Sequence, residues 1–284
     1  MDHTDDDYVL DRDFLASLRL RLQHYAVKQM QGWMISPDAK AHLDTLSKPK
    51  IMDLATGNGI WATDLSELYP NADIIGLDLS DEQFPVHGQL PENVHLNTYD
   101  LFTPAPEMHR GKYDLVHLRL TVGWIHGRDG NVVLQNALSF LKPGGYLQWE
   151  ENTGPNAERP NDAAWVVKPD GTYTRGWPSW LTALSSPSLL AAFSWLQGLP
   201  ELFGQNGLEE VQVYRPEPRK ALLRTHTDCL KWTLEEIHGA MIRGGVPGSQ
   251  EMRRSAIAAM DEDVRKGYSF VYGWTIVVGR KPPS

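Results

Sequence analysis

Cysteine is almost absent from this sequence, which has one, Cys229, in 284 residues. A single thiol cannot form a disulfide within the chain, so a framework of internal disulfides is excluded. The chain also has no Asn-x-Ser/Thr acceptor, and its acidic start, MDHTDDDY, lacks the basic and apolar stretches of a secretory signal. These absences predict an intracellular, cytoplasmic protein whose residues 1–13 form a disordered acidic tail.

Long apolar runs and concentrated basic charge are missing too. No run approaches the roughly 20 apolar residues that span a bilayer, and the densest basic stretch, RKALLR from Arg219, is short and diluted with leucine. With a net charge of −9 and a pI of about 5.6, the chain is not expected to bind along a phosphate backbone. We expect no membrane span, no nucleic-acid partner and no metal site, whereas the oligomeric state is not predicted.

The chain does contain an alternation of strand-like and helical segments. A helical segment with an apolar stripe covers residues 14–34, and a short helix precedes Lys48. Strand-like runs follow at KIMDLA, ADIIGLD, NVHLNTYD, YDLVHLRL and GGYLQWEE, with helical or turn segments between most of them. This order is typical of an α/β fold with a mostly parallel sheet covered on both faces. Two later strands, LEEVQVYRP and YSFVYGWTIVVGRK, enclose a largely helical insertion at 225–266.

These segments divide the rest of the chain into four parts. We expect a helical N-terminal lid at 14–48, a Rossmann-like core at 49–151, a cap or substrate insertion at 152–207, and further core strands within 208–284. The insertion at 152–207 shows no strand signals and is rich in Pro, Gly, Ser and Trp. Its tryptophans indicate either a lid over an apolar, aromatic-binding pocket or packing of a cap onto the core; they are Trp165, Trp177, Trp180 and Trp195.

The segment IMDLATGNGIWATDL, residues 51–65, carries the strongest functional signal. A strand pattern containing Asp53 leads into a glycine turn and then into a helical pattern. Gly57, Gly59 and Ala62 match the dinucleotide fingerprint G-x-G-x-x-A, and Asp78 lies about twenty residues further on, where a ribose-binding acid is expected. Taken alone, these features suggest NAD.

Three acids at successive strand ends favour a different cofactor. Asp53, just before the glycine turn, would repel a pyrophosphate but attract an ammonium and a sulfonium. Asp78 can accept from ribose hydroxyls, and Asp100 from an adenine amino group. Because these strand ends meet at one edge of the sheet, the set predicts S-adenosyl-L-methionine. The alternatives are a solvating acid at Asp53, a helix cap at Asp78 and a loop residue at Asp100.

At these residues the sequence resembles the class I S-adenosylmethionine-dependent methyltransferases. The first motif of that family is acid, apolar, Gly, x, Gly, x, Gly, and here Ala55 replaces its first glycine. The resemblance continues through YDLVHLR, LKPGGYLQWEE and IVVGRK, while RLRLQH, ATGNGIWATDL and LPENVHL are similar to fungal methyltransferases of secondary metabolism. It implies a sheet whose last strand is antiparallel and methylation of a small, apolar or aromatic molecule.

The strand ends and the resemblance together identify candidate cofactor-binding residues. They are Arg19, Asp53, Ala55, Thr56, Gly57, Asn58, Gly59, Asp78, Leu79, Asp100, Leu101 and His117. Arg19 is expected on one side of the first helix with Gln23 and His24, where it either pairs with the cofactor carboxylate or faces solvent. His117 shares a strand face with Arg119 and is alternatively a buried structural histidine.

Candidates for catalysis are fewer, because the sulfonium already activates the methyl carbon and the protein mainly aligns the acceptor and excludes water. A neutral hydroxyl would need a base. His126, in a loop after the fourth strand, and Glu151, at the end of the fifth, are the candidates, and each is alternatively a solvated residue. We predict O-methylation of a secondary metabolite. A cyclase that keeps its cofactor unspent and a regulatory partner protein are the alternatives.

Overall fold

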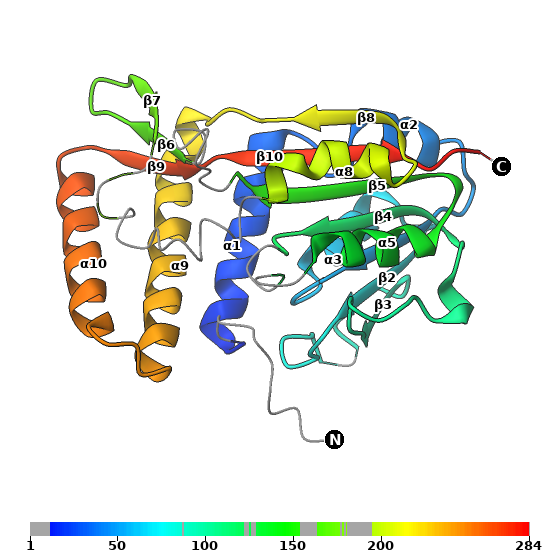
Figure 1. Cartoon of the computed structure of the whole chain (residues 1–284), viewed down its shortest axis with the longest axis horizontal. Helices are drawn as coiled ribbons and strands as arrows, with labels where there is room; N and C mark the ends of the chain where they lie inside the picture. The colour runs from blue at the N-terminus through cyan, green and yellow to red at the C-terminus, as the bar shows by residue number, and fades with distance from the viewer. Residues whose placement is uncertain are drawn as a thin grey trace.

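The computed structural model describes residues 12–86, 88–121, 125, 129–153, 164–176, 178, 180 and 195–283. Seven strands of this part form a sheet with the order β3-β2-β1-β4-β5-β10-β8 (Figure 1). Strands β1 to β5 pair in parallel, and β10 is antiparallel to both of its neighbours. The predicted Rossmann-like sheet with an antiparallel last strand is confirmed. The strands are β1 (Lys50–Leu54), β2 (Asp73–Asp78), β3 (Val94–Thr98), β4 (Tyr113–Arg119), β5 (Leu141–Asn152), β8 (Glu209–Tyr214) and β10 (Trp274–Arg280).

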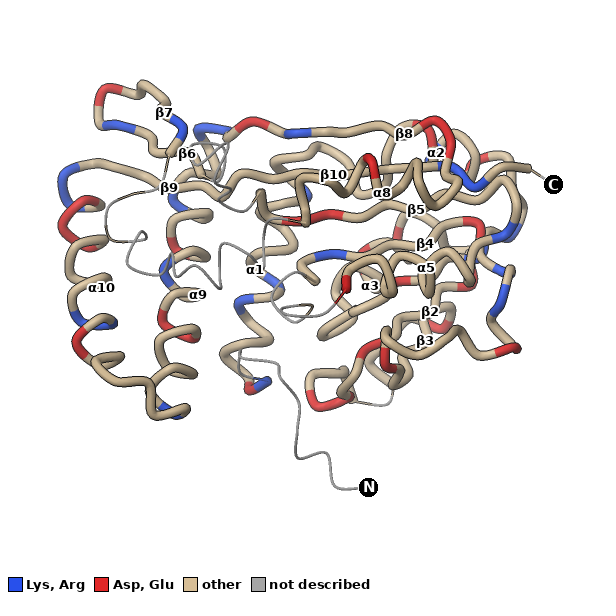
Figure 2. The backbone as a smooth tube through the Cα atoms, viewed as in Figure 1, with Lys and Arg blue, Asp and Glu red and all other residues tan. Residues whose placement is uncertain are grey.

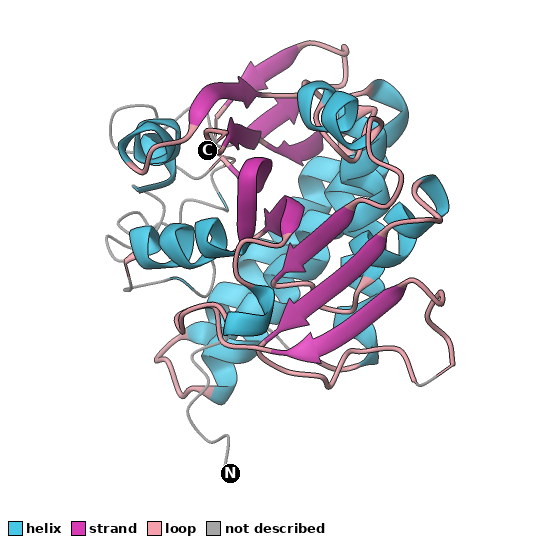
Figure 3. Cartoon of the chain, turned by 90° about the vertical axis from the view of Figure 1, so that its right-hand side faces the viewer, coloured by secondary structure: helices cyan, strands magenta, loops and turns pink. Residues whose placement is uncertain are grey.

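Helices cover both faces of the sheet, as Figure 3 shows from the side. One face packs against α1 (Phe14–Gln31), α2 (Pro37–Leu43) and α3 (Ile60–Leu68), and the other against α5 (Gly130–Phe140) and α8 (Leu199–Gln205). Strand β4 is buried at every residue before Arg119. Such a continuous buried run is what a strand covered on both faces requires, and it explains why YDLVHLR is so apolar.

A second, smaller sheet lies beside the core, at the left in Figure 1. Its order is β7-β6-β9, from β6 (Ala164–Val167), β7 (Tyr173–Arg175) and β9 (Ser269–Tyr272). The helices α9 (Leu223–Arg243) and α10 (Ser249–Arg265) pack against it through a buried cluster, which contains Trp180, Leu230, Leu234, Met260 and Phe270. Since β9 leads directly into β10 after Gly273, the two sheets are joined by one nearly continuous stretch of extended chain.

Charged residues of both signs are interspersed on α9 and α10 (Figure 2). Arg253 of α10 pairs with Glu235 of α9 at 2.6 Å, and Lys231 of α9 pairs with Asp261 of α10 at 2.5 Å. Exposed pairs of this kind contribute little, about 0 to 1 kcal/mol each. The buried cluster under the two helices therefore supplies most of the energy that holds them together.

Helix α1 lies between the core and α9 (Figure 1). The Asp13 side chain caps its first turn by accepting from the amide of Ala16 at 2.8 Å. It ends at Gln31, three residues before the predicted end at residue 34, and Gly32, with a φ of 81°, forms its left-handed cap. Within the described residues, no helix is long and apolar enough to cross a membrane.

Two expectations about strands were wrong. The insertion at 152–207 was expected to lack strands but contains β6 and β7, and YSFVYGWTIVVGRK was expected to be one strand but forms β9 and β10 in different sheets. Most of the residues expected to form a helical insertion, 225–266, lie in α9 and α10. The expected tail at residues 1–11 and residues 154–163, 177, 179 and 181–194 of the insertion lie outside the described residues.

Candidate functional site

The three acids singled out from the sequence do lie at one edge of the sheet. Asp53 is near the end of β1, Asp78 is the last residue of β2, and Asp100 follows β3 by two residues. Since β1, β2 and β3 are adjacent and parallel, their carboxyl ends face the same side. This is the edge at which open α/β sheets bind ligands.

The turn after β1 is built on left-handed backbone. Gly57 and Gly59 have φ values of 59° and 73°, and Ala55 has a φ of 55° although it carries a side chain. A Cβ atom on Gly59 would lie 2.6 Å from Leu96 Cδ1, so a larger residue there would clash. Ala55 thus adopts the conformation that suits the glycine of the motif, at a cost of about 1 to 2 kcal/mol. The turn keeps its shape in spite of the substitution.

Asp78 holds the turn from the neighbouring strand. Its Oδ2 atom accepts from the amide of Gly57 at 2.7 Å, while its Oδ1 atom lies 3.4 Å from the amide of Ser80. Burial raises the pKa of Asp78 to about 6, although the backbone donors of Gly57 and Ser80 work in the opposite direction. No helix follows Asp78 in the described chain, so it is not the helix cap considered above. Its carboxylate remains able to accept further hydrogen bonds.

Asp53 is buried, with 2% of its surface exposed, and both of its oxygens are engaged. Oδ1 lies 2.7 Å from His117 Nδ1, and Oδ2 accepts from the Thr56 hydroxyl at 2.6 Å. On the other side of the imidazole, His117 Nε2 lies 3.5 Å from Glu150 Oε1. Burial lowers the pKa of His117, but the bonds and charges of these two carboxylates outweigh it and raise the pKa above its usual value. His117 therefore bridges two buried acids.

The surroundings of His117 extend this arrangement to α1. The ring stacks on Trp61 of α3, with centroids 3.9 Å apart and planes 3° from parallel. Glu150 accepts from Gln31 of α1 at 3.0 Å and from Gln148 at 2.6 Å. Burial raises the pKa of Glu150, but His117 and Arg119 lower it by more. The pKa therefore lies below its usual value, and the carboxyl is ionised at neutral pH. The sequence patterns did not predict a role for Gln31 or Gln148. For Gln148 a signal was available, because Gln148 and Glu150 are polar residues on one face of the buried strand β5.

Helix α1 packs against the glycine turn. Asn58 Nδ2 donates to both the carbonyl and the hydroxyl of Ser17, at 3.0 Å each. A Cβ atom on Gly57 would lie 3.2 Å from Leu20 Cδ1, so the helix side chain rests almost on the backbone of the turn. Replacement of Gly57 would therefore disturb the lid as well as the turn.

Arg19, a candidate for the cofactor carboxylate, pairs with an acid of α9 in this structure. Its Nε atom donates to Glu236 Oε1 of α9 at 2.8 Å, and both side chains are buried. Its Nη1 atom donates to Gln23 at 3.3 Å. Binding of a cofactor carboxylate would require Arg19 to exchange or share this partner, and it remains a prediction.

His24 does not share the side of Arg19 and Gln23, which corrects the expectation. It lies 2.8 Å from Asp64 of α3 and 3.1 Å from Arg119. Five residues along a helix correspond to about 140° of rotation beyond a full turn, so His24 faces the core while Arg19 faces α9.

The remaining cofactor candidates lie beside the second and third acids. Asp100 Oδ1 accepts from the amide of Phe102 at 2.9 Å, an arrangement typical of a loop start. Leu101 is buried, and its carbonyl accepts from Asn136 of α5 at 2.7 Å. Leu79 is 47% exposed. The loop alternative thus describes the position of Asp100 without excluding a ligand on its second oxygen.

Of the two catalytic candidates, only Glu151 is described. It is buried, and its Oε1 atom accepts from the amide and hydroxyl of Thr121 at 2.6 and 2.5 Å and from Trp149 Nε1 at 3.0 Å. Leu120, just before Thr121, has a φ of 58°, a strained value for leucine that no sequence signal foretold. Glu151 therefore anchors the chain as it leaves β4 and is not a solvated residue. His126 lies outside the described residues.

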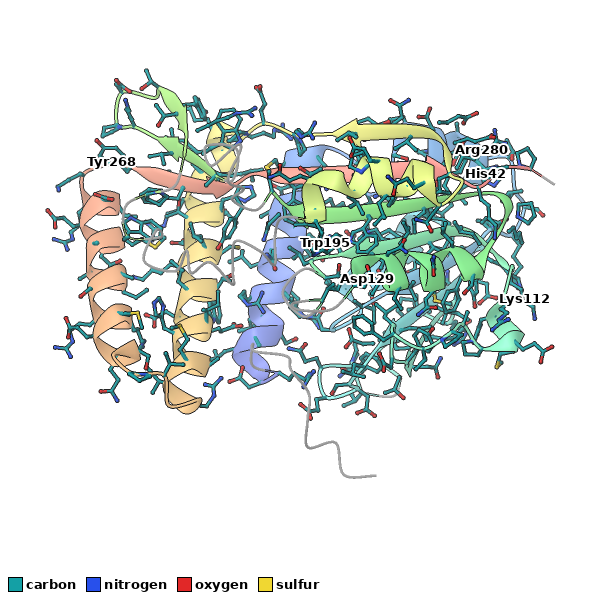
Figure 4. The ribbon with its side chains drawn as sticks, in the orientation of Figure 1. His42, Lys112, Asp129, Trp195, Tyr268 and Arg280 are labelled. Atoms are coloured by element: carbon teal, nitrogen blue, oxygen red, sulfur yellow. The ribbon has the colours of Figure 1, made fainter. Side chains whose placement is uncertain are left out.

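The three insertion tryptophans that the structure describes pack against different aromatic side chains. Trp165 packs against Tyr173, and Trp180 packs edge-on against Phe270. Trp195 contacts Trp149 of β5 and lies beside Asp129 at the start of α5 (Figure 4). These three follow the packing alternative, while Trp177 lies outside the described residues. Among the side chains described, no three His, Cys, Asp or Glu form a group that could hold a metal ion.

Comparison with known proteins gives matches of three kinds. The family model described as "Methyltransferase domain" matches residues 16–212. Methyltransferase grgD of Penicillium sp is 40% identical over 122 residues, which cover 40% of this chain and 42% of that protein. N-methyltransferase verN of Clonostachys rogersoniana is 34% identical over 145 residues, which cover 50% of this chain and 49% of that protein. The matches therefore span about half the length of these curated relatives.

Among solved structures, the YcgJ protein of Bacillus subtilis has a similar fold. Its TM-score is 0.50 at 15% identity, and the match covers 87% of this chain and 98% of that one. At this identity the similarity bears on the fold alone.

Proposed function

The chain belongs to the methyltransferase-domain family, and from this premise we propose that it transfers a methyl group from S-adenosyl-L-methionine to a small molecule. The observation that carries the proposal is the set of acids at one sheet edge, with Asp53 placed directly before a left-handed glycine turn. An acid at this point suits a ligand with positive charge and opposes a pyrophosphate.

The residues at this edge fit such a cofactor. Asp78, whose Oδ1 atom lies 3.4 Å from the Ser80 amide, would accept from the ribose hydroxyls. Asp100 would accept from the adenine amino group, with the Leu101 amide next to it. Leu79 follows Asp78 at the same edge. The turn of Ala55, Thr56, Gly57, Asn58 and Gly59 would lie along the methionine part, and when bound the cofactor would supply an activated methyl carbon.

In this proposal His117 acts on the cofactor through Asp53. Its hydrogen bond at 2.7 Å fixes the direction of the Asp53 carboxylate, and Thr56 fixes the other oxygen. Each carboxylate oxygen has a second lone pair, so Asp53 can still accept from an ammonium group. His117 is therefore a positioning residue, while Asp53 would contact the cofactor.

The protein's part in the transfer is to align the acceptor and exclude water. Helix α1 would close over the glycine turn, with Arg19 a candidate partner for the cofactor carboxylate. Glu151 holds Thr121 at the end of β4 and would shape the acceptor side of the site. His126 remains the candidate base for a hydroxyl acceptor.

We propose a secondary metabolite as the acceptor, methylated at oxygen. The fungal relatives grgD and verN support the methyltransferase part of this proposal by their names. Nitrogen is the second candidate for the acceptor atom, because verN is named an N-methyltransferase. Fragmentation of the methylated product in a mass spectrometer distinguishes the two.

Turnover tests the proposal. The purified chain is incubated with S-adenosyl-L-methionine and a panel of phenols, alcohols and cyclic amides, and both products are measured by mass spectrometry. We expect S-adenosylhomocysteine and a product heavier by one CH₂ group in equal amounts. A product of unchanged mass with the cofactor unspent would indicate a cyclase. Binding of the cofactor without any turnover of the panel would favour a regulatory protein, and either result contradicts the proposal.

A further inference from the structure

A small cavity lies at the junction of α1, α9 and the ends of β5 and β10. Its volume is about 20 Å³, enough for one water-sized group. The part of the lining that α1 provides includes Ala26, Val27 and Met30, and α9 adds Cys229. The strand ends provide Asn152 and Trp274, which are paired in register. The cavity therefore opens where β5 reaches the ligand-binding edge of the sheet.

Three polar atoms in this lining have no hydrogen-bond partner within the part of the chain that the structure describes. They are Asn152 Oδ1, His226 Nε2 and Trp274 Nε1, and each is itself buried. His226 is 8% exposed and Trp274 is 3% exposed. Since buried polar groups are nearly always hydrogen-bonded, three such atoms around one cavity indicate a site that is completed by another molecule.

The chemistry of the three atoms restricts what can complete the site. An indole N–H only donates and an amide oxygen only accepts, so the occupant must both accept from Trp274 and donate to Asn152. Burial lowers the pKa of His226 to about 4, so the imidazole is neutral at pH 7 and can serve either role. The lining residues described here include no ionised side chain. A neutral hydroxyl matches these demands, whereas a carboxylate or an ammonium does not.

The position of the cavity relates it to the proposed reaction. Asn152 ends β5, the strand that carries Glu151, and α1 forms one wall of the cavity while covering the glycine turn with Leu20 and Ser17. Since Asn152 is the last residue of β5, the cavity lies at the same carboxyl edge of the sheet as the proposed cofactor site.

We propose that this cavity binds a hydroxyl group of the acceptor molecule, which makes hydroxylated small molecules with an apolar body the substrate class. This inference rests on the proposed function. The apolar part of the lining favours a hydrocarbon next to the hydroxyl, and the polar atoms fix its orientation. The anchored hydroxyl and the methylated atom need not be the same group.

Phenol is a suitable probe, and the indole N–H of Trp274 is a reporter inside the site. Protein labelled with ¹⁵N gives one indole signal for each of its 10 tryptophans, and Trp274→Phe identifies the signal of Trp274. We expect phenol to shift this signal saturably. Anisole has the same ring but no donor, so its affinity should be lower by about tenfold or more.

Asn152→Ala tests the acceptor in the lining while keeping the reporter. It should weaken phenol binding by about fivefold or more, because the hydroxyl loses its acceptor. Asn206→Ala is the matched control, since Asn206 ends α8 and bonds to Asn131 and Leu202 away from the cavity. It should leave phenol binding unchanged.

Two results would overturn the proposal. If phenol does not shift the Trp274 signal, the cavity holds a structural water only. If anisole binds as well as phenol, or Asn152→Ala changes nothing, the polar atoms do not recognise a hydroxyl. Calorimetry with S-adenosylhomocysteine on the same sample separates these failures from failure of the proposed function, because Asp53, Asp78 and Asp100 are not part of the cavity lining.

Discussion

Asp78→Ala is expected to weaken the binding of S-adenosylhomocysteine by about tenfold or more. Hydrogen bonds from hydroxyls to an ionised carboxylate contribute about 1.5 to 3 kcal/mol each, and 1.4 kcal/mol corresponds to a factor of ten in affinity. The variant also loses the acceptor for the Gly57 amide, which helps to shape the turn. Isothermal titration calorimetry on folded protein measures the change directly.

The pH dependence of binding distinguishes a carboxylate that binds ligand from one that only holds the turn. Because the pKa of Asp78 is raised to about 6, lowering the pH through this value protonates the Asp78 carboxylate of the protein without ligand. The protonated carboxyl must lose this proton before it can accept from both ribose hydroxyls. Between about pH 7 and pH 5 the affinity of the natural chain should fall by about tenfold. In Asp78→Asn this pH dependence should be absent.

Asp73→Asn is the control, because Asp73 starts β2 at the opposite edge of the sheet. It should not alter the affinity. If Asp78→Ala binds S-adenosylhomocysteine as tightly as the natural chain, Asp78 has only a structural role in the turn.

His117→Leu is expected to lower the free energy of unfolding by about 3 to 5 kcal/mol. The imidazole lies between Asp53 and Glu150, both buried, and its removal leaves two carboxylates without their shared partner. Removing one member of a buried charged group usually costs this much, because the remaining charge is left without compensation. Urea denaturation at constant pH measures the difference.

The loss should depend on pH in a defined direction. The pKa of His117 is raised in the folded chain, so its contribution to stability is complete below about pH 6.5 and declines as the pH rises through the folded value. The difference in the free energy of unfolding between the natural chain and His117→Leu should therefore be full at pH 6 and smaller at pH 9.

His95→Leu serves as the control, since His95 lies exposed on β3. Its effect should stay within about 0.5 kcal/mol. A loss below about 1 kcal/mol in His117→Leu would mean that His117 is not the charged link between Asp53 and Glu150.

The features predicted correctly from the sequence depend on local patterns. Strand β1, the glycine turn and α3 follow each other without a gap, so a few consecutive residues determine all three. The same holds for the apolar run of β4 and for the acids that end β2 and β3. Parallel pairing then brings these ends together, which is why the acids of the candidate site could be named in advance.

The features missed depend on pairing between distant segments. β6 and β7 have four and three residues, too few for a clear alternation, and β6 is completed by β9 about a hundred residues later. Arg19 and Glu236 are 217 positions apart, and Gln31 and Glu150 are 119 positions apart. Helical periodicity placed Arg19 and Gln23 together on α1, but it did not give the element packed against that face, and the expected face of His24 was wrong.

Calorimetric comparison of S-adenosylhomocysteine with NADH tests the central claim most directly. Both ligands contain adenosine, so Asp78 and Asp100 serve either one, and only the groups near Asp53 and the glycine turn differ between them. If the buried Asp53 selects a cationic ligand, S-adenosylhomocysteine, which carries an ammonium, should bind measurably and NADH, with its pyrophosphate, should bind far more weakly. Tighter binding of NADH than of S-adenosylhomocysteine would contradict the account.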